Sequence, residues 1–162
     1  MTDKRGRIFV AVGIDAPRPE LPFVERDAIT AIVRDRRTRK YLILRWKKAD
    51  WVTFITGGIE KGQTGKDAAR AEVHQETGYK NLRLVAELPR FQSKFYHRPK
   101  GENRFGHFQA FLFELINHER DRVSEAETAE HEPELICETD LGDLRLPEGH
   151  RYLIDYVLER GL

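Results

Sequence analysis

A glycine-rich turn followed at once by a segment of helical periodicity is the feature that most constrains this chain. Residues 57–79 read GGIEKGQTGKDAARAEVHQETGY. The periodicity predicts a helix over 64–77, with Thr64 as its N-cap and Gly78 as its C-terminal stop. The apolar residues expected to face inward are Ala68, Ala69 and Val73. The chain should therefore contain a strand, a tight turn and a helix in immediate succession.

Two glutamates lie on one face of this predicted helix. Glu72 and Glu76 are four residues apart, and the side chain of Gln75 lies beside them. Like charges at this spacing destabilise a bare helix, whereas a hard cation such as Mg²⁺ takes oxygen ligands and would relieve the repulsion. The alternative is a solvated face whose glutamates pair with Arg70, Lys80 or water.

The glycines of the turn favour the hypothesis that a cation or a phosphate binds beside the two glutamates. Gly57 and Gly58 permit a tight turn with free backbone groups at the end of a strand. Gly62 and Gly65 keep the approach to the helix open. Backbone groups exposed in this way suit phosphates or a metal ion.

The remaining pattern predicts an α/β or α+β sandwich with a mixed sheet. Strands are expected at residues 7–14, 28–33, 41–46, 51–56, 82–88, 91–97, 107–115 and 134–138. The strand at 107–115 should be covered on both faces, because apolar residues occupy both of its alternating sets. A closing helix is expected at 150–160, with an apolar stripe formed by Leu153, Ile154, Val157 and Leu158. The proline-rich connector at 16–22 divides an N-terminal strand segment, 1–22, from the main domain, 23–162.

Composition narrows the class of partner. With 28 Lys plus Arg against 27 Asp plus Glu, the formal charge is +1, which argues against nucleic acid and anionic membrane as partners. The single cysteine, Cys137, excludes a disulfide framework and is expected to be a small buried hydrophobe. The chain shows neither a signal peptide nor an apolar run long enough to span a membrane, and we expect it in the cytoplasm.

The segment 57–79 resembles the Nudix box, in which Gly, five residues, Glu and seven residues precede Arg-Glu-aliphatic-x-Glu-Glu-x-Gly-aliphatic. The frame fits without a gap, and the order of the elements over about 23–160 is also similar to Nudix domains. The matching positions are Gly57, Glu72, Val73, Glu76, Gly78 and Tyr79, with Gly58 inside the turn. Three positions depart from the pattern: Gln63 replaces Glu, Ala71 replaces Arg, and Gln75 replaces Glu.

The resemblance implies a Nudix-type α/β/α sandwich and a hydrolase that uses Mg²⁺, or Mn²⁺, to cleave a nucleoside diphosphate linked to another group. It implies that Glu72 and Glu76 bind the metal, with a backbone carbonyl from Gly57 and Gln75 as an auxiliary ligand. Because a neutral amide replaces a carboxylate at position 75, divalent binding should be weakened.

Some family enzymes place a further carboxylate or base on a loop outside the box. This chain offers Glu125, Glu127, Glu130, His131 and Glu132 in a stretch, 125–134, that is expected to be a loop or short irregular turn. Glu130 and Glu132 are the predicted contributors, and an acidic solvent-facing loop is the alternative.

A second stretch mixes aromatic rings with cations. Lys94, Tyr96 and Arg104 are predicted to bind substrate, because a nucleobase stacks on rings while Lys and Arg hold phosphates. The alternative is a β-hairpin of core aromatics and exposed charges. His97 and His107 lack the spacing of zinc ligands.

Two functions from different classes remain open. The leading one is the hydrolase, with a small nucleotide as its ligand and a homodimer as a further expectation, since the first strand is free to pair with a neighbour's sheet. The other is a catalytically weak nucleotide-binding or protein-interaction module, which Gln63, Ala71 and Gln75 favour. Segments around 23–28, 47–51 and 93–108 are also similar to Nudix-like modules inserted in some bacterial leucyl-tRNA synthetases.

Overall fold

An eight-stranded mixed sheet organises the chain, and the computed structural model describes residues 6–162. The order along the sheet is β1-β6-β7-β2-β3-β4, with β5 paired to β2 and β8 paired to β3. The β1–β6 and β2–β7 pairs are parallel and the other pairs are antiparallel. The strands are β1 (Arg7–Val10), β2 (Phe23–Asp35), β3 (Tyr41–Trp46), β4 (Val52–Thr53), β5 (Ile55–Gly58), β6 (Leu82–His97), β7 (Glu102–Leu115) and β8 (His131–Ile136).

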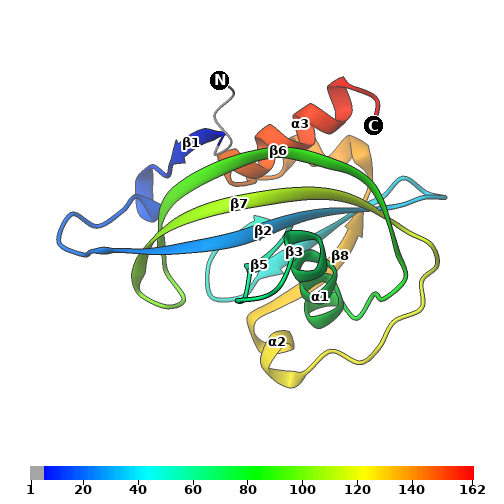
Figure 1. Cartoon of the computed structure of the whole chain (residues 1–162), viewed down its shortest axis with the longest axis horizontal. Helices are drawn as coiled ribbons and strands as arrows, with labels where there is room; N and C mark the ends of the chain where they lie inside the picture. Colours follow the sequence, from blue (N-terminus) through cyan, green and yellow to red (C-terminus); the bar gives the residue numbers. More distant parts are fainter. Residues whose placement is uncertain (1–5) are drawn as a thin grey trace.

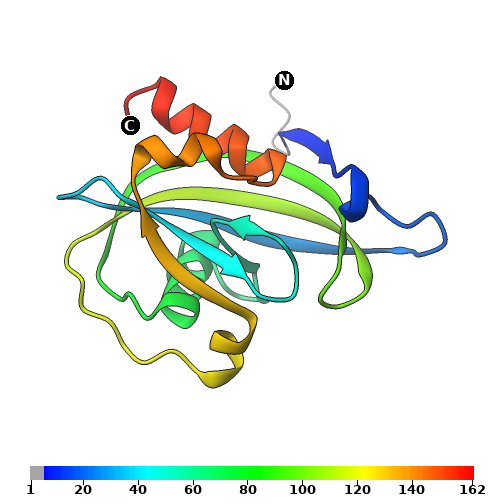
Figure 2. The same cartoon turned by 180° about the vertical axis from the view of Figure 1, so that it is seen from behind.

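Helices cover both faces of this sheet. In Figures 1 and 2, α3 (Glu148–Glu159) lies on one side, and α1 (Gly65–Thr77) and α2 (Glu125–Glu130) lie on the other. The expected α/β/α sandwich with a mixed sheet is confirmed. Within residues 6–162, no helix is both long and apolar enough to cross a membrane.

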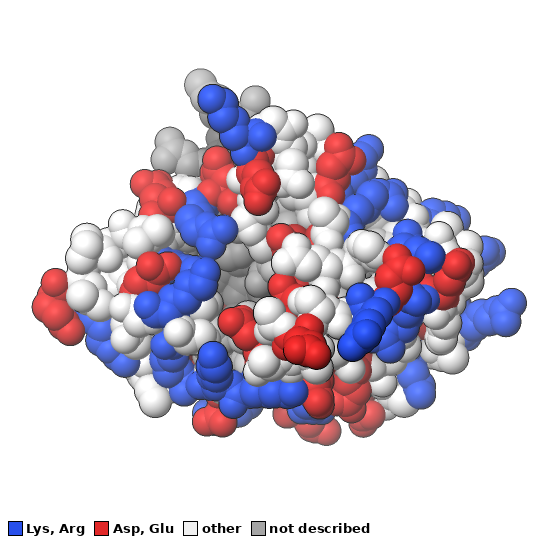
Figure 3. Space-filling model, turned by 90° about the horizontal axis from the view of Figure 1, so that it is seen from below, with Lys and Arg blue, Asp and Glu red and all other residues white. Residues whose placement is uncertain are grey.

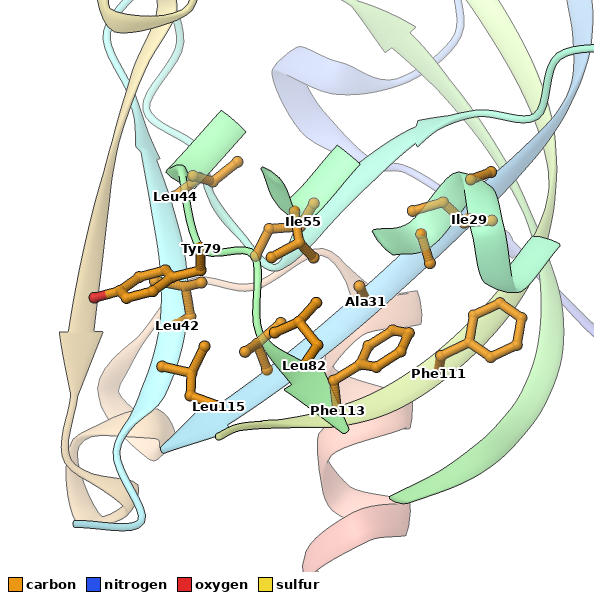
Figure 4. Close-up of a cluster of buried hydrophobic side chains, with 14 residues drawn as sticks. Ile29, Ala31, Leu42, Leu44, Ile55, Tyr79, Leu82, Phe111, Phe113 and Leu115 are labelled. Carbon is orange, nitrogen blue, oxygen red and sulfur yellow. The ribbon is translucent and has the colours of Figure 1, made fainter. Parts of the chain in front are cut away.

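Strand β7 is buried on both faces, as its alternation predicted. Phe111 and Phe113 belong to the cluster beneath α1, which Figure 4 shows together with residues from β2, β3 and β5. Ala110 and Leu112 belong to the second cluster, which contains the buried residues of α3. The central strand thus joins two hydrophobic layers, each closed by a helix.

Helix α1 begins and ends at the predicted residues. The hydroxyl oxygen of Thr64 accepts a hydrogen bond from the backbone N–H of Asp67 at 3.1 Å. Gly78 adopts a left-handed conformation with φ +82°, and its N–H donates to the carbonyl of His74. The inward residues Ala68, Ala69 and Val73 are buried in the first cluster, which fixes the direction of the opposite, glutamate-bearing face.

The two strands expected at 82–88 and 91–97 are one strand, β6. Its register against β7 shifts between Leu84 and Ala86 and again between Leu88 and Phe91. Pro89 lies in the second irregularity, where a missing N–H costs no ladder hydrogen bond. Bulges therefore explain why the sequence pattern suggested a break in β6. Strand β7 begins at Glu102, five residues before the expected start, because its pairing with β6 continues to the tight turn after His97.

Other boundaries also required correction. The expected first strand ends at Val10 and is followed by a 3₁₀ turn, η1 (Gly13–Asp15), and the strand expected at 51–56 is divided into β4 and β5. The acidic stretch forms α2, and the strand after it begins at His131, three residues early. The predicted apolar stripe on α3 is buried except at Leu158, which is 37% exposed.

Cys137 was expected to be buried and is exposed. It follows the end of β8, just before a 3₁₀ turn, η2 (Glu138–Asp143).

The N-terminal segment is attached to the chain's own β6–β7 hairpin. Strand β1 pairs with Phe91–Lys94 of β6. Asn103, which is fully buried, accepts from the N–H of Arg18 at 2.8 Å and donates to the carbonyls of Arg18 and Leu21. Asp15 accepts hydrogen bonds from Trp51 and Arg98. The proline-rich connector is thus held along its length by named polar contacts.

Candidate metal centre

The glycine turn lies directly against a glutamate of α1. A Cβ added to Gly57 would overlap the side chain of Glu72, so the backbone at this position is in close contact with that carboxylate. Gly57 and Gly58 end β5, which pairs with β2 through Ile29 and Ala28. The sequence needs glycine here because any side chain would displace Glu72. The predicted neighbours Gly57 and Glu72 are therefore brought together.

The second glutamate of α1 is deeply buried. Glu76 is 7% exposed, and its Oε2 atom has no hydrogen-bond partner in the part of the chain that the structure describes. A buried polar atom without a partner costs free energy on the order of 1 to 3 kcal/mol, and more when it is charged. Such an atom is unusual in a native structure and points to a missing ligand.

Helix α2 and strand β8 bring two further groups to Glu76. His131 Nε2 lies 3.8 Å from Glu76 Oε1 and 3.2 Å from Glu127 Oε2. Glu127 and His131 are four residues apart, so the end of α2 presents both toward α1. Glu76, Glu127 and His131 each offer one ligand atom, and these atoms lie within 4.8 Å of one another. We call these three residues together with Glu72 the carboxylate cluster.

Burial and mutual repulsion dominate the electrostatics of the cluster. Burial, followed by the negative charge of Glu127, raises the pKa of Glu72 to about 7. Burial also raises the pKa of Glu76 well above its usual value, and Glu72, Glu127 and Glu130 raise it further. Burial lowers the pKa of His131, although the neighbouring glutamates oppose that shift. The cluster thus brings together carboxyl groups whose charges raise the pKa of Glu72 and Glu76.

The cations expected to pair with the helix glutamates are engaged elsewhere. Arg70 donates to the carbonyl of Leu82 at 2.8 Å. Lys80 pairs with Asp121 at 3.0 Å and with Glu119 at 3.3 Å. Pairing of the helix glutamates with Arg70 or Lys80, which was one form of the solvated-face alternative, is therefore wrong.

A different arginine, which the sequence pattern did not indicate, faces Glu72. Arg26 on β2 lies beside the turn, since a Cβ on Gly58 would overlap its guanidinium. Its charge lowers the pKa of Glu72 against the larger opposing effect of burial. No hydrogen bond or ion pair occupies this guanidinium within residues 6–162. Only the register of β2 against β5, which follows from the fold, places Arg26 here.

The residues that depart from the box have local partners. Gln75 donates from its amide to Glu127 Oε1 at 2.7 Å, which joins α1 to α2. Gln63 accepts from the N–H of Glu60 at 3.0 Å, and its own N–H donates to the carbonyl of Glu60, which closes the turn before α1. Ala71 is exposed.

The structure separates the two predicted loop carboxylates. Glu132 is exposed and pairs with Lys47 at 3.4 Å, on the outer side of β8. Glu130 is half-buried and acts on Glu76 through its charge. The members of the cluster from this stretch are instead Glu127 and His131, two of the five acidic or basic candidates.

The three predicted substrate residues lie along the β6–β7 hairpin and contact neighbours there. Lys94 lies over the rings of Phe23 and Phe105, at 5.4 and 4.7 Å from their centroids. Tyr96 is covered by the guanidinium of Arg18 at 4.2 Å, and Arg104 pairs with Glu102 at 2.9 Å. Lys94 and Tyr96 thus contact the N-terminal segment at Val10 and Arg18, whereas Arg104 pairs within β7.

The cluster lies on the α1 and α2 side of the sheet. Figure 3 views this side and shows a hollow near the middle of the surface, flanked by Asp or Glu side chains and by Lys or Arg side chains. The residues present fit a divalent cation: two or three carboxylates, a backbone turn in contact with one of them, and a buried oxygen without a partner.

A mixed sheet between helices, with paired glutamates on the helix that follows a glycine turn, defines the class of Nudix-type pyrophosphohydrolases. The model of the NUDIX domain family matches residues 24–157, which is most of the chain. The chain belongs to the Nudix family.

Solved structures agree on the fold. A Nudix hydrolase from Nitrosomonas europaea has a TM-score of 0.59 at 17% identity, covering 84% of this chain and 90% of its own. A MutT structure, from work on Aliivibrio salmonicida and Vibrio cholerae, has a TM-score of 0.57 at 13% identity and covers 85% and 99%. A UDP-X diphosphatase has a TM-score of 0.59 at 16% identity and covers 89% and 68%. No curated protein matches the sequence.

Proposed function

We propose that the chain is a divalent-metal-dependent hydrolase that cleaves the diphosphate linkage of a nucleoside diphosphate derivative. The observation that carries this proposal is Glu76, a buried carboxylate whose Oε2 atom has no partner although Glu72 and Glu127 lie close by. Burial and the neighbouring carboxylates raise the pKa of Glu72 and Glu76, and a bound cation would relieve this repulsion. Mg²⁺ or Mn²⁺ would serve as that cation.

The chain's own residues would hold the ion and orient the substrate. Glu72 and Glu76 are the proposed ligands, with the carbonyl of Gly57 and the side-chain oxygen of Gln75 as auxiliary ligands. When bound, the ion would neutralise charge on the diphosphate and activate water. Arg26, whose guanidinium is unoccupied beside the turn within residues 6–162, would pair with a diphosphate oxygen at the mouth of the site.

The substrate class rests on the family and on names carried by structural neighbours. Those names include MutT, a UDP-X diphosphatase and, in Francisella tularensis, a bifunctional NMN adenylyltransferase and ADP ribose pyrophosphatase. We propose a small nucleotide of this kind as the ligand. Lys94, Tyr96 and Arg104 remain proposed contacts to it. A cytoplasmic setting, a homodimer and a domain division at residues 22 and 23 also remain proposals.

A second candidate is a nucleotide-binding or protein-interaction module with little turnover. The hydrogen bond from Gln75 to Glu127 favours it, because an amide now satisfies a carboxylate that a third helix glutamate would repel. Gln63 and Ala71 remove two further charges of the box.

The test is hydrolysis of ADP-ribose, UDP-sugars, NADH, diadenosine polyphosphates and nucleoside triphosphates with Mg²⁺ or Mn²⁺. Glu76→Gln is the loss variant, and Glu125→Gln, an exposed change on α2, is the matched control. Turnover that requires metal, survives in Glu125→Gln and vanishes in Glu76→Gln supports the hydrolase. Equal, negligible turnover in all three proteins, with retained nucleotide binding, supports the binding module instead.

A further inference from the structure

The carboxylate cluster contains a nitrogen donor. His131 is 2% exposed, and its Nε2 atom faces both Glu127 and Glu76, at 3.2 and 3.8 Å. The three residues come from β8, α2 and α1, so the arrangement results from tertiary packing and not from one acidic segment.

The position of the imidazole is fixed by the sheet. His131 is opposite Trp46 in the β3–β8 register, and the two rings meet edge to face with centroids 4.9 Å apart. Trp46 is itself held by a hydrogen bond from its Nε1 to Thr53 at 2.9 Å. A histidine held in this way loses little rotamer freedom when it binds a ligand.

Internal pairing does not account for the cluster. Glu76 is more than nine-tenths buried, and its Oε2 atom is without a partner among residues 6–162. Lys47, near the start of β8, pairs with Glu132 and donates to the carbonyl of Thr128. Glu76, Glu127 and His131 therefore have no Lys or Arg partner among residues 6–162.

The donor chemistry discriminates between metals. Mg²⁺ prefers an all-oxygen, octahedral set and keeps several waters, whereas imidazole nitrogen suits first-row transition metals. We propose that His131 Nε2 is a metal ligand together with Glu76 and Glu127, and that the site takes a transition-metal ion such as Mn²⁺ or Zn²⁺ in preference to Mg²⁺. This inference deepens the proposed function and rests on it for its catalytic consequence.

Metal binding to the full, metal-free chain tests the inference without an activity assay. Titration calorimetry with Mn²⁺, Zn²⁺ and Mg²⁺ gives the affinities, and pulsed electron paramagnetic resonance of bound Mn²⁺ detects coupling to a directly bound ¹⁴N nucleus. The variant is His131→Gln, which offers an oxygen in place of the nitrogen. The matched control is His74→Gln, because His74 is exposed on α1 and pairs with Asp121 outside the cluster.

The expected result is one transition-metal ion per chain, bound at least about tenfold more tightly than Mg²⁺. His131→Gln should remove the nitrogen coupling and most of that preference, while affinity for Mg²⁺ changes little, and His74→Gln should behave as wild type. Absence of nitrogen coupling, or an equal loss for all three metals, would overturn the proposal and leave His131 as a hydrogen-bond donor to Glu127.

Two further outcomes separate this inference from the hydrolase proposal. Nitrogen-coupled metal binding without turnover of any diphosphate would retain the metal site and reject the enzyme. Turnover that is supported equally by Mg²⁺ and unchanged in His131→Gln would retain the enzyme and reject the nitrogen ligand. If His131→Gln fails to fold, the wild-type protein alone tests the ligand: nitrogen coupling to bound Mn²⁺ supports His131 as a ligand, and its absence rejects it.

Discussion

Gln75 and Glu127 are joined by a hydrogen bond of 2.7 Å from the amide of one to Oε1 of the other, between α1 and α2. This contact occupies the position at which a Nudix box would carry another glutamate. The neutral amide joins α2 to α1 and leaves the candidate metal centre with one carboxylate fewer than the box pattern provides.

The variant Gln75→Glu should exchange stability for metal affinity. Without metal, the new carboxylate would repel Glu127 and lower the free energy of unfolding by about 1 kcal/mol. With metal, the added charge should tighten binding. Thermal unfolding and metal titration measure both effects, and the double variant Gln75→Glu/Glu127→Gln should recover the metal-free stability. Unchanged stability in the single variant would contradict the assigned contact.

The variant Glu76→Gln should have the opposite effect. The raised pKa of Glu76 means that this carboxyl destabilises the folded state at neutral pH, so a neutral amide should add on the order of 1 to 2 kcal/mol to the unfolding free energy of the metal-free protein. Stabilisation by added divalent metal, which follows from binding to the folded state alone, should disappear. Denaturant titrations with and without metal provide the measurement. A variant still stabilised by metal as strongly as wild type would show that Glu76 is not a ligand.

Arg26→Gln should weaken substrate binding while leaving the fold intact. Arg26 is exposed, and its guanidinium is unoccupied in the described part of the chain, so the free energy of unfolding should change by less than about 0.5 kcal/mol. Loss of a charged contact to the diphosphate should raise KM by about tenfold. Steady-state kinetics test this, with Arg36→Gln, an exposed change beyond the end of β2, as the control. An unchanged KM would remove Arg26 from the site.

Gly57→Ala should disrupt the metal centre through sterics alone. The added Cβ would overlap Glu72, and moving either the turn or the helix face costs roughly 1 to 3 kcal/mol. We expect loss of metal-dependent stabilisation in thermal unfolding. Gly142→Ala is the matched control, because a Cβ there meets open space. Wild-type metal binding in Gly57→Ala would place the site away from this turn.

Stability should fall in acid because of a histidine remote from the site. His150 accepts a hydrogen bond from the N–H of Phe54 and packs among the rings of Phe54 and Phe91, and burial lowers its pKa from 6.5 to about 3. The unfolded chain therefore binds a proton that the folded chain excludes. The contribution of His150 is complete above pH 6.5 and is lost as pH falls toward 3, at about 1.4 kcal/mol per pH unit.

The comparison of wild type with His150→Gln isolates this effect. Between pH 6.5 and 5, wild type should lose about 2 kcal/mol more unfolding free energy than the variant. Urea denaturation at several pH values measures the difference. Parallel pH profiles for the two proteins would show that His150 is not the group responsible.

Local signals made part of the fold predictable. Thr64 and Gly78 mark the ends of α1 because capping and left-handed conformation depend on the residue itself. The alternation along β7 revealed two covered faces because period 2 is a property of any strand. These features needed no knowledge of distant contacts.

Long-range pairing decided the rest. Arg26 reaches Glu72 through the β2–β5 register, and His131 reaches Glu76 through the β3–β8 register. Glu127 reaches the same place through the contact of α2 with α1. Helix α2 has six residues, too few to show a helical period, so its acidic composition predicted a loop. The sequence therefore indicated two of the carboxylates, and the fold supplied their partners.

The two helices that carry glutamates of the carboxylate cluster, α1 and α2, differ in how much of each is buried. Helix α1 packs Val73 and Thr77 into the core, whereas α2 has no buried residue and is capped by Ser124 alone at its start. Detachment of this one short helix would withdraw Glu127 and admit water to Glu76 while the sheet stays folded. Exchange of a bound ion would then depend on the contacts that hold α2, namely those of Gln75 with Glu127 and of Lys47 with Thr128 and Glu130, rather than on the stability of the whole protein.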